Sequence, residues 1–168
     1  MSYLNRVLLG VFLMMGFISC GNYSFTGASI GSDTKTFSVD LFSTSAALAP
    51  PSLSQTFTES LRDLFQTQTS LSLVNDEADL QFNGTITGYN VRPVAVQGDE
   101  IAAKNRLTIT VRVNYINTKN DDDNFDRSFN RFFEFDNSQD LSSVQDDLIK
   151  QITDQLVQDV FNESVGNW

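Results

Sequence analysis

The sequence predicts an α+β fold, a two-layer sandwich in which a mainly antiparallel four-stranded sheet carries two amphipathic helices on one face. Four segments alternate apolar and polar residues, as half-buried strands do. Two longer segments repeat apolar residues at helical spacing, and the order along the chain is strand, helix, three strands, helix. Packing both helices on one face buries every apolar stripe and leaves the polar side of the sheet for water or a partner.

Residues 1–19 are typical of a bacterial export signal. Arg6 supplies positive charge, and the apolar residues that follow it end at Ser19, a small residue just before Cys20. The apolar run is shorter than the about 20 residues that a membrane-spanning helix needs. The stretch "FISC" resembles a lipobox. We therefore expect diacylation of Cys20, with fatty acids such as palmitate; the alternatives are an ordinary cleaved signal or an N-terminal helix of the fold.

Residues 20–36 are expected to form the lipidated N-terminus and a tether, because they are rich in Gly, Ser and Thr. No acidic cluster follows the cysteine, which resembles lipoproteins that face the periplasm. Residues 37–168 are expected to form a single α+β domain. Its first strand covers residues 36–42 and has its inward side at Phe37, Val39 and Leu41.

The first predicted helix begins at Pro50-Pro51, since proline is tolerated in a first turn. Its apolar face consists of Leu53, Phe57, Leu61, Leu64 and Phe65, and no helix breaker occurs before about Thr69.

The second helix is expected from about residue 141 to residue 162, with Asp140 as N-cap. Phe161 falls on its polar side and Asp159 on its apolar side. We therefore expect the last turn to fray or to contact another element.

Three strands are expected between the helices. Residues 78–96 alternate, but the apolar parity shifts after Gly88, which predicts a β-bulge there. Residues 105–117 form the most regular strand. After the hairpin loop "NTKNDDDN", residues 125–135 return with one parity occupied by Phe125, Phe129, Phe133 and Phe135.

Composition narrows the range of functions that the chain could have. The chain has 21 acidic and 11 basic residues, a formal net charge of −10, so it should repel nucleic acid and anionic lipid surfaces. It has no histidine, so a Ser-His-Asp or Cys-His arrangement cannot be built. Its single cysteine permits no disulfide within the chain. We expect neither enzyme activity nor a cofactor.

The acidic run "DDDNFD", residues 121–126, is interpreted as a hairpin turn rather than a metal site, because Arg127 stands where a Ca²⁺ loop starting at Asp122 requires glycine. Arg112, Arg127 and Arg131 project from strands. They either contact phosphates or carboxylates of a ligand or pair with acids such as Asp126 or Glu134, and the second alternative is favoured.

Three aromatic residues are candidates for partner contact. Phe132 has the opposite parity from Phe133 and is expected to be exposed on the second sheet face. Tyr23 and Phe25 follow the anchor too closely to be assumed buried in the domain.

The stretches "GNYSFTGAS", "LSQTFTESLRDLFQTQTSLSLV" and "ADLQFNGTITGYNVRPVAV" resemble the LptE family of lipopolysaccharide-assembly lipoproteins, in its Bacteroidetes-type branch. The resemblance covers residues 20–168 and implies a two-layer α/β fold. It also implies a partner, the outer-membrane β-barrel LptD, which the lipoprotein plugs and helps to assemble. The resemblance further implies that the pair delivers lipopolysaccharide to the outer leaflet without catalysis, and that the lipoprotein is anchored on the periplasmic side of the outer membrane. Direct contact with lipopolysaccharide is not assigned to residues, because no basic motif of the family matches this acidic chain.

Other functions remain open. A free-standing periplasmic ligand-binding lipoprotein would need a cavity between sheet and helices and no barrel. A surface-exposed lipoprotein is a lesser variant. An enzyme is the least favoured, since no acid–base pair or metal-binding set is found in the sequence.

Overall fold

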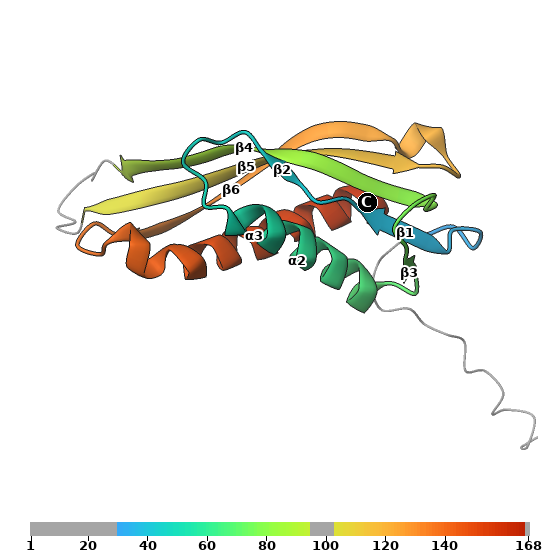
Figure 1. The fold of residues 1–168 in the computed structure, drawn as a ribbon, viewed down its shortest axis with the longest axis horizontal. Coiled ribbons are helices and arrows are strands. Elements are labelled where there is room, and N and C mark those ends of the chain that lie inside the picture. The colour runs from blue at the N-terminus through green and yellow to red at the C-terminus, as the bar shows by residue number, and fades with distance from the viewer. Residues whose placement is uncertain (1–29, 95–102, 167–168) are drawn as a thin grey trace, which may run out of the picture.

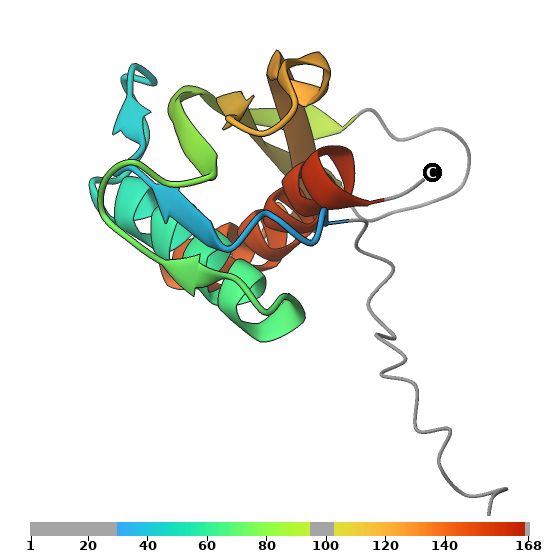
Figure 2. The ribbon, with the colours of Figure 1, turned by 90° about the vertical axis from the view of Figure 1, so that its right-hand side faces the viewer.

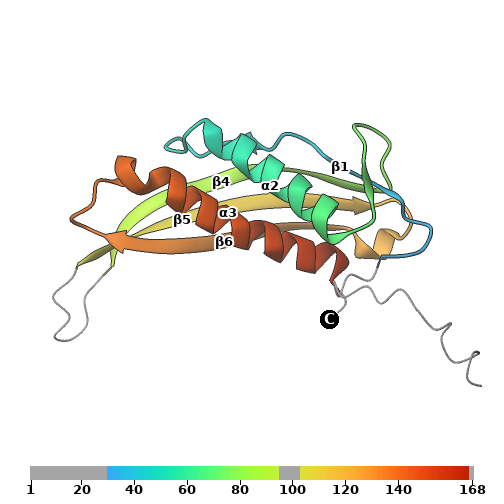
Figure 3. The same ribbon diagram turned by 90° about the horizontal axis from the view of Figure 1, so that it is seen from below.

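Two helices, α2 (Ser52–Gln68) and α3 (Leu141–Val165), lie on one face of a long six-stranded sheet (Figure 1). The computed structural model describes residues 30–94 and 103–166. Seen from the helix side, α3 runs along β5 and β6 while α2 lies beside it (Figure 3). A 3₁₀ turn, η2 (Asp121–Asp123), joins the last two strands. The strands are β1 (Thr36–Val39), β2 (Ser43–Thr44), β3 (Ser72–Leu73), β4 (Leu80–Val94), β5 (Lys104–Asn117) and β6 (Phe125–Asp136).

The strand order is β3-β1-β4-β5-β6, and β2 pairs with β4 beyond the end of β1. β4, β5 and β6 are antiparallel, whereas β1, β2 and β3 run parallel to their neighbours. The expected four-stranded, mainly antiparallel sheet is therefore wrong in detail: the sheet has six strands and is mixed. The parallel pairs arise because α2 carries the chain back before β4 begins. β2 and β3 have two residues each, too few to show an alternating pattern.

Elements in the middle of the chain agree with the expectations. α2 begins directly after Pro51 and ends before Thr69. The β4–β5 register shifts between Ile86 and Gly88, so the predicted bulge is confirmed. The shift brings Tyr89 to the buried side of the sheet, where its side chain is 5% exposed.

Phe65 of α2 joins the two layers. Its ring centroid lies 5.3 Å from that of Phe37 on β1, 4.8 Å from that of Phe82 on β4 and 5.0 Å from that of Phe161 on α3. Phe37, Phe65 and Phe82 are completely buried. Aromatic rings at these distances contribute beyond the area that they bury, so this cluster fixes both helices against the same sheet face.

α3 ends at Val165, beyond the expected end near residue 162. Of the two alternatives for its last turn, contact with another element is confirmed, because the Phe161 ring packs against that of Phe65 on α2. Phe161 is buried, although helical spacing places it off the main apolar stripe, because α2 packs beside α3 and covers a second side of the helix. An apolar stripe therefore underestimates burial where a helix touches both a sheet and another helix.

The inward side of the first strand is also corrected. β1 ends at Val39, and Leu41 is 68% exposed while Phe42 is 1% exposed. The chain leaves the regular ladder between β1 and β2, and the N–H of Phe42 donates to Oγ1 of Thr58 on α2, which turns the Phe42 ring into the core.

Gly84 of β4 provides the space for that ring. A Cβ atom at this position would lie 2.6 Å from Cε1 of Phe42 and 2.1 Å from the carbonyl oxygen of Arg112 on β5. The second contact is with backbone, which cannot move without breaking the β4–β5 ladder. Glycine is therefore required by close packing rather than by a special backbone angle.

Asp79 joins three elements at one end of the sheet. Its carboxylate accepts hydrogen bonds from the backbone N–H groups of Lys35 (2.7 Å) and Thr36 (3.0 Å), and it forms an ion pair with Nζ of Lys119 (2.9 Å). The hydrogen bond from Lys119 and those from the backbone hold the pKa of Asp79 far below its ordinary value of 3.8. The same pairing raises the pKa of Lys119.

Replacement of Gly84 by alanine is expected to lower the free energy of unfolding by about 3 kcal/mol, at the upper end of what overpacking costs. Gly88→Ala is the matched control, because an added Cβ there would meet the Thr110 side chain at 3.0 Å instead of backbone. Urea denaturation followed by circular dichroism measures both variants. Equal stability of the two would contradict the packing argument.

Asp79→Asn is expected to lower the urea midpoint at pH 7. A carboxyl group whose pKa is lower in the folded than in the unfolded state stabilises the fold above the unfolded value and loses this contribution as the pH falls. The difference between the wild type and the variant should therefore shrink below about pH 4. Denaturation curves at pH 7 and pH 3 test this, and an unchanged difference would disprove the assigned role.

Candidate functional site

The face of the sheet opposite the helices is polar. The apolar side chains of β5 point to the helices, from Leu107 through Tyr115, and the alternate residues point the other way. Along the centre of this second face β5 places Arg106, Thr108, Thr110, Arg112 and Asn114. Register adds residues from both neighbouring strands, among them Asn83, Thr85, Asn90 and Arg92 of β4 and Asp126, Ser128, Asn130, Phe132 and Glu134 of β6. We call this surface the open face.

Arg112 is one of the charged residues on the open face. Its Nε and Nη2 atoms donate to the two carboxylate oxygens of Asp126, each at 2.7 Å. This bidentate bond raises the pKa of Arg112 and lowers that of Asp126. The pair lies across the β5–β6 strands, as one of the two alternatives from the sequence predicts.

Phe132 is 47% exposed on the open face. The guanidinium carbon of Arg106 lies 4.0 Å from the centroid of its ring, and Arg106 also donates from Nε to Glu134 at 3.1 Å. The structure therefore places Phe132 where the sequence predicts it and adds Arg106 as its neighbour. The alternation of β5 puts Arg106 on this face, but its diagonal contact with Phe132 depends on register, which alternation does not supply.

Arg127 and Arg131 do not belong to the open face. Both share the parity of the β6 phenylalanines and point toward α3, where Arg127 pairs with Glu163, and Arg131 donates to Asp159 at 2.5 and 2.6 Å. The hydrogen bond to Asp159 raises the pKa of Arg131. The three arginines singled out in the sequence therefore lie on two opposite faces and form no common ligand site.

A basic hollow lies at the end of the open face near Val94. Arg92 is directly opposite Arg106 in the β4–β5 register, and both line an open depression of about 510 Å³ together with Asn90 and Thr108. The guanidinium of Arg92 is exposed, whereas that of Arg106 already pairs with Glu134, so Arg92 is the better placed of the two to contact an anion.

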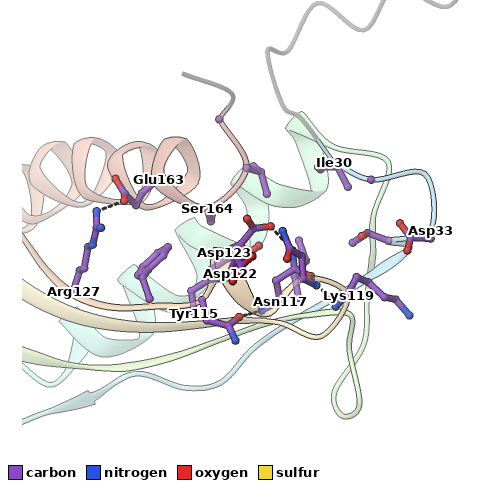
Figure 4. A pocket seen from close by; sticks show the side chains of 18 residues that line it. Ile30, Asp33, Tyr115, Asn117, Lys119, Asp122, Asp123, Arg127, Glu163 and Ser164 are labelled. Carbon is purple, nitrogen blue, oxygen red and sulfur yellow. Dashed lines mark hydrogen bonds and ion pairs between the residues drawn. The ribbon is translucent and has the colours of Figure 1, made fainter.

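A polar cavity of about 610 Å³ lies at the opposite end of the sheet (Figure 4). Ile30 and Gly166 both line it, so the first and last described residues meet at this end of the domain, as the end-on view also shows (Figure 2). Within it, Nδ2 of Asn117 donates to Asp123 at 2.9 Å. Burial raises the pKa of Tyr115, which forms part of the floor.

Possible metal ligands are not grouped in either region. In residues 30–94 and 103–166, no three His, Cys, Asp or Glu side chains are grouped as metal ligands. Within the same ranges neither helix is long and apolar enough to cross a membrane. Cys20, Tyr23 and Phe25 lie outside the described residues, so their predicted roles stay predictions.

Comparisons with known proteins give a family for the chain and solved structures with a similar fold. The family model LptE, described as lipopolysaccharide-assembly, matches residues 34–164. A minor lipoprotein from Acinetobacter baumannii is 14% identical, with a TM-score of 0.50 over 77% of this chain and 91% of that one. A neuraminyllactose-binding hemagglutinin homolog from Helicobacter pylori is 13% identical, with a TM-score of 0.51 over 81% and 86%. At these identities the two structures indicate the fold alone. No curated protein matches the sequence.

A double-mutant cycle with Arg131→Ala and Asp159→Asn is expected to give a coupling of about 0.5 kcal/mol, since the pair is partly exposed and screened by solvent. Lys150 and Asp154, an exposed pair within α3, serve as the control and should couple less. A coupling no larger than that of the control would show that the Arg131–Asp159 pair does not fasten α3 to β6.

Proposed function

Because the chain belongs to the LptE family of lipopolysaccharide-assembly proteins, we propose that it plugs the LptD β-barrel and assists its assembly for lipopolysaccharide transport to the outer leaflet. LptE-family proteins are non-enzymatic outer-membrane lipoproteins. In this chain the anchor would be Cys20, acylated on the periplasmic side. The open face carries the proposal: a broad polar sheet surface that the described residues leave uncovered suits the polar lumen of a barrel.

The length of the sheet supports insertion into a lumen. β4 has 15 residues and β5 has 14. At about 3.3 Å per residue these strands extend for roughly 50 Å, against an apolar barrel band about 25 Å tall. A plug of this length reaches through the membrane-embedded part of a barrel.

The tether limits which end stays near the periplasmic surface. Nine residues separate Cys20 from Ile30, and the ten Cα–Cα steps between them span at most roughly 35 Å at about 3.5 Å each. The end of the domain with the polar cavity therefore stays close to the anchored lipid. The basic hollow lies at the other end of the strands and would enter the barrel first.

The basic hollow favours lipopolysaccharide phosphates as a second contact. Arg92 and Arg106 are opposite one another, and Arg92 is exposed. Two neighbouring arginines stand out in this chain because its net charge is −10. The competing function, a free-standing ligand-binding lipoprotein, is less well supported, because the Phe65 cluster fills the space between sheet and helices.

Purification through a tag after Trp168 from detergent-solubilised outer membranes is expected to recover one large β-barrel at equal stoichiometry. Cys20→Ala is the control for anchoring and should recover much less. Recovery of the lipoprotein alone, from membranes that still contain the barrel, would rule out the plug.

Phe132→Ala is expected to reduce barrel recovery about tenfold, the effect of losing one buried aromatic side chain at an interface. Leu48→Ala is the matched control, because Leu48 is 79% exposed but lies in the loop before α2, off the open face. Thermal unfolding of both free variants should match the wild type. Equal recovery of the two variants would exclude the open face at Phe132 from the interface.

A further inference from the structure

β6 is an edge of the sheet. It pairs with β5 on one side, and no described residue pairs with it on the other. The N–H of Asn137, just past the strand, donates to the carbonyl oxygen of Ala103, so the odd-numbered residues direct their backbone toward β5. The even-numbered residues therefore direct their N–H and C=O groups outward: Asp126, Ser128, Asn130, Phe132, Glu134 and Asp136.

β6 lacks the features that normally protect an exposed edge. It has 12 residues, contains no proline or glycine, and keeps an unbroken register with β5. Four of its five charged residues are paired with an opposite charge within the chain, which weakens their repulsion of an approaching strand. The pairs are Asp126 with Arg112, Arg127 with Glu163, Arg131 with Asp159, and Glu134 with Arg106. The fifth, Asp136, is the last residue of the strand and accepts a hydrogen bond from Oγ of Ser138.

The opposite edge has several such features. β1 has four residues and β2 and β3 two each. Nε of Arg62, on α2, donates to the carbonyl oxygen of Val39 at the end of β1. Beyond β2, the β4 edge is interrupted by the bulge near Gly88 and by Pro93. One edge of the sheet is thus closed to pairing and the other is open.

Aromatic rings along the open edge are incompletely covered. Phe125, Phe129 and Phe133 pack against the core from the helix side of β6 but are only half-buried. A strand added beside β6 would cover their exposed sides and satisfy the outward backbone groups at the same time.

We propose that β6 accepts an added strand from the barrel partner. This inference rests on the proposed function. A closed barrel has no unpaired backbone in its wall, so the strand must be an extended segment outside the wall, such as a loop that enters the lumen. The segment alternates, with apolar residues over Phe129 and Phe133 and uncharged polar or basic residues on the side of the open face. A second copy of the chain is disfavoured, because each copy carries a net charge of −10.

The variant Asn130→Pro tests the pairing. The N–H of Asn130 points outward, so proline removes a donor that β5 does not use and blocks close approach of a new strand. Asn130→Ala is the matched control, because it removes the same side chain and keeps the N–H. The purified complex of lipoprotein and barrel should form with Asn130→Ala, and on the order of tenfold less should form with Asn130→Pro.

Hydrogen exchange of the peptide that contains β6 completes the test. In the free mature lipoprotein the outward amides should exchange fast, and in the complex they should become protected. A complex in which these amides still exchange fast would overturn the added strand and leave the plug intact, whereas failure of the wild type to form a complex would overturn the plug. Protection in the free chain, or protection that rises with its concentration, would assign the edge to the chain itself or to a second copy and would also overturn the proposal.

Discussion

The packing of Phe65 against both the sheet and α3 is the interaction on which the rest of the structure depends. Its contacts with Phe37, Phe82 and Phe161 place both helices on the same face. Large apolar side chains are concentrated in this one layer, so the remaining polar side chains of β4, β5 and β6 are gathered on the opposite face. The open face is thus a consequence of one-sided core packing, and the proposed role in a polar lumen follows from it.

Charge in the chain is balanced locally although it is unbalanced overall. The arginines of β5 and β6 named above each bond to a carboxylate of a neighbouring strand or of α3. Exposed pairs of this kind add little stability. On the open face, the Arg106–Glu134 and Arg112–Asp126 pairs link side chains of β5 and β6 across the strands.

Alternation and helical spacing predict the central elements, including the bulge near Gly88, because each depends on the local pattern of side chains. Parallel pairing could not be predicted in this way, since it depends on the path of the chain through α2. The side of the sheet on which Arg127 and Arg131 lie could be predicted in part, because both share the parity of Phe129. Asp159 falls on the apolar side of its helix, which marks it as a possible partner. The Arg131–Asp159 bond explains that placement. The burial of Phe161 could not be predicted from its own helix, because it depends on α2 packing beside α3.

The proposed acylation of Cys20 would change what binding strength the open face needs. With the lipid inserted, the domain would be confined near the membrane by the nine residues between Cys20 and Ile30, and tethering over so short a stretch gives effective concentrations on the order of millimolar. Contacts that would be too weak for a freely diffusing protein then suffice for nearly complete occupancy. A face made of threonine, asparagine and paired arginine, with one exposed phenylalanine, can therefore serve as an interface while staying soluble before its partner is met.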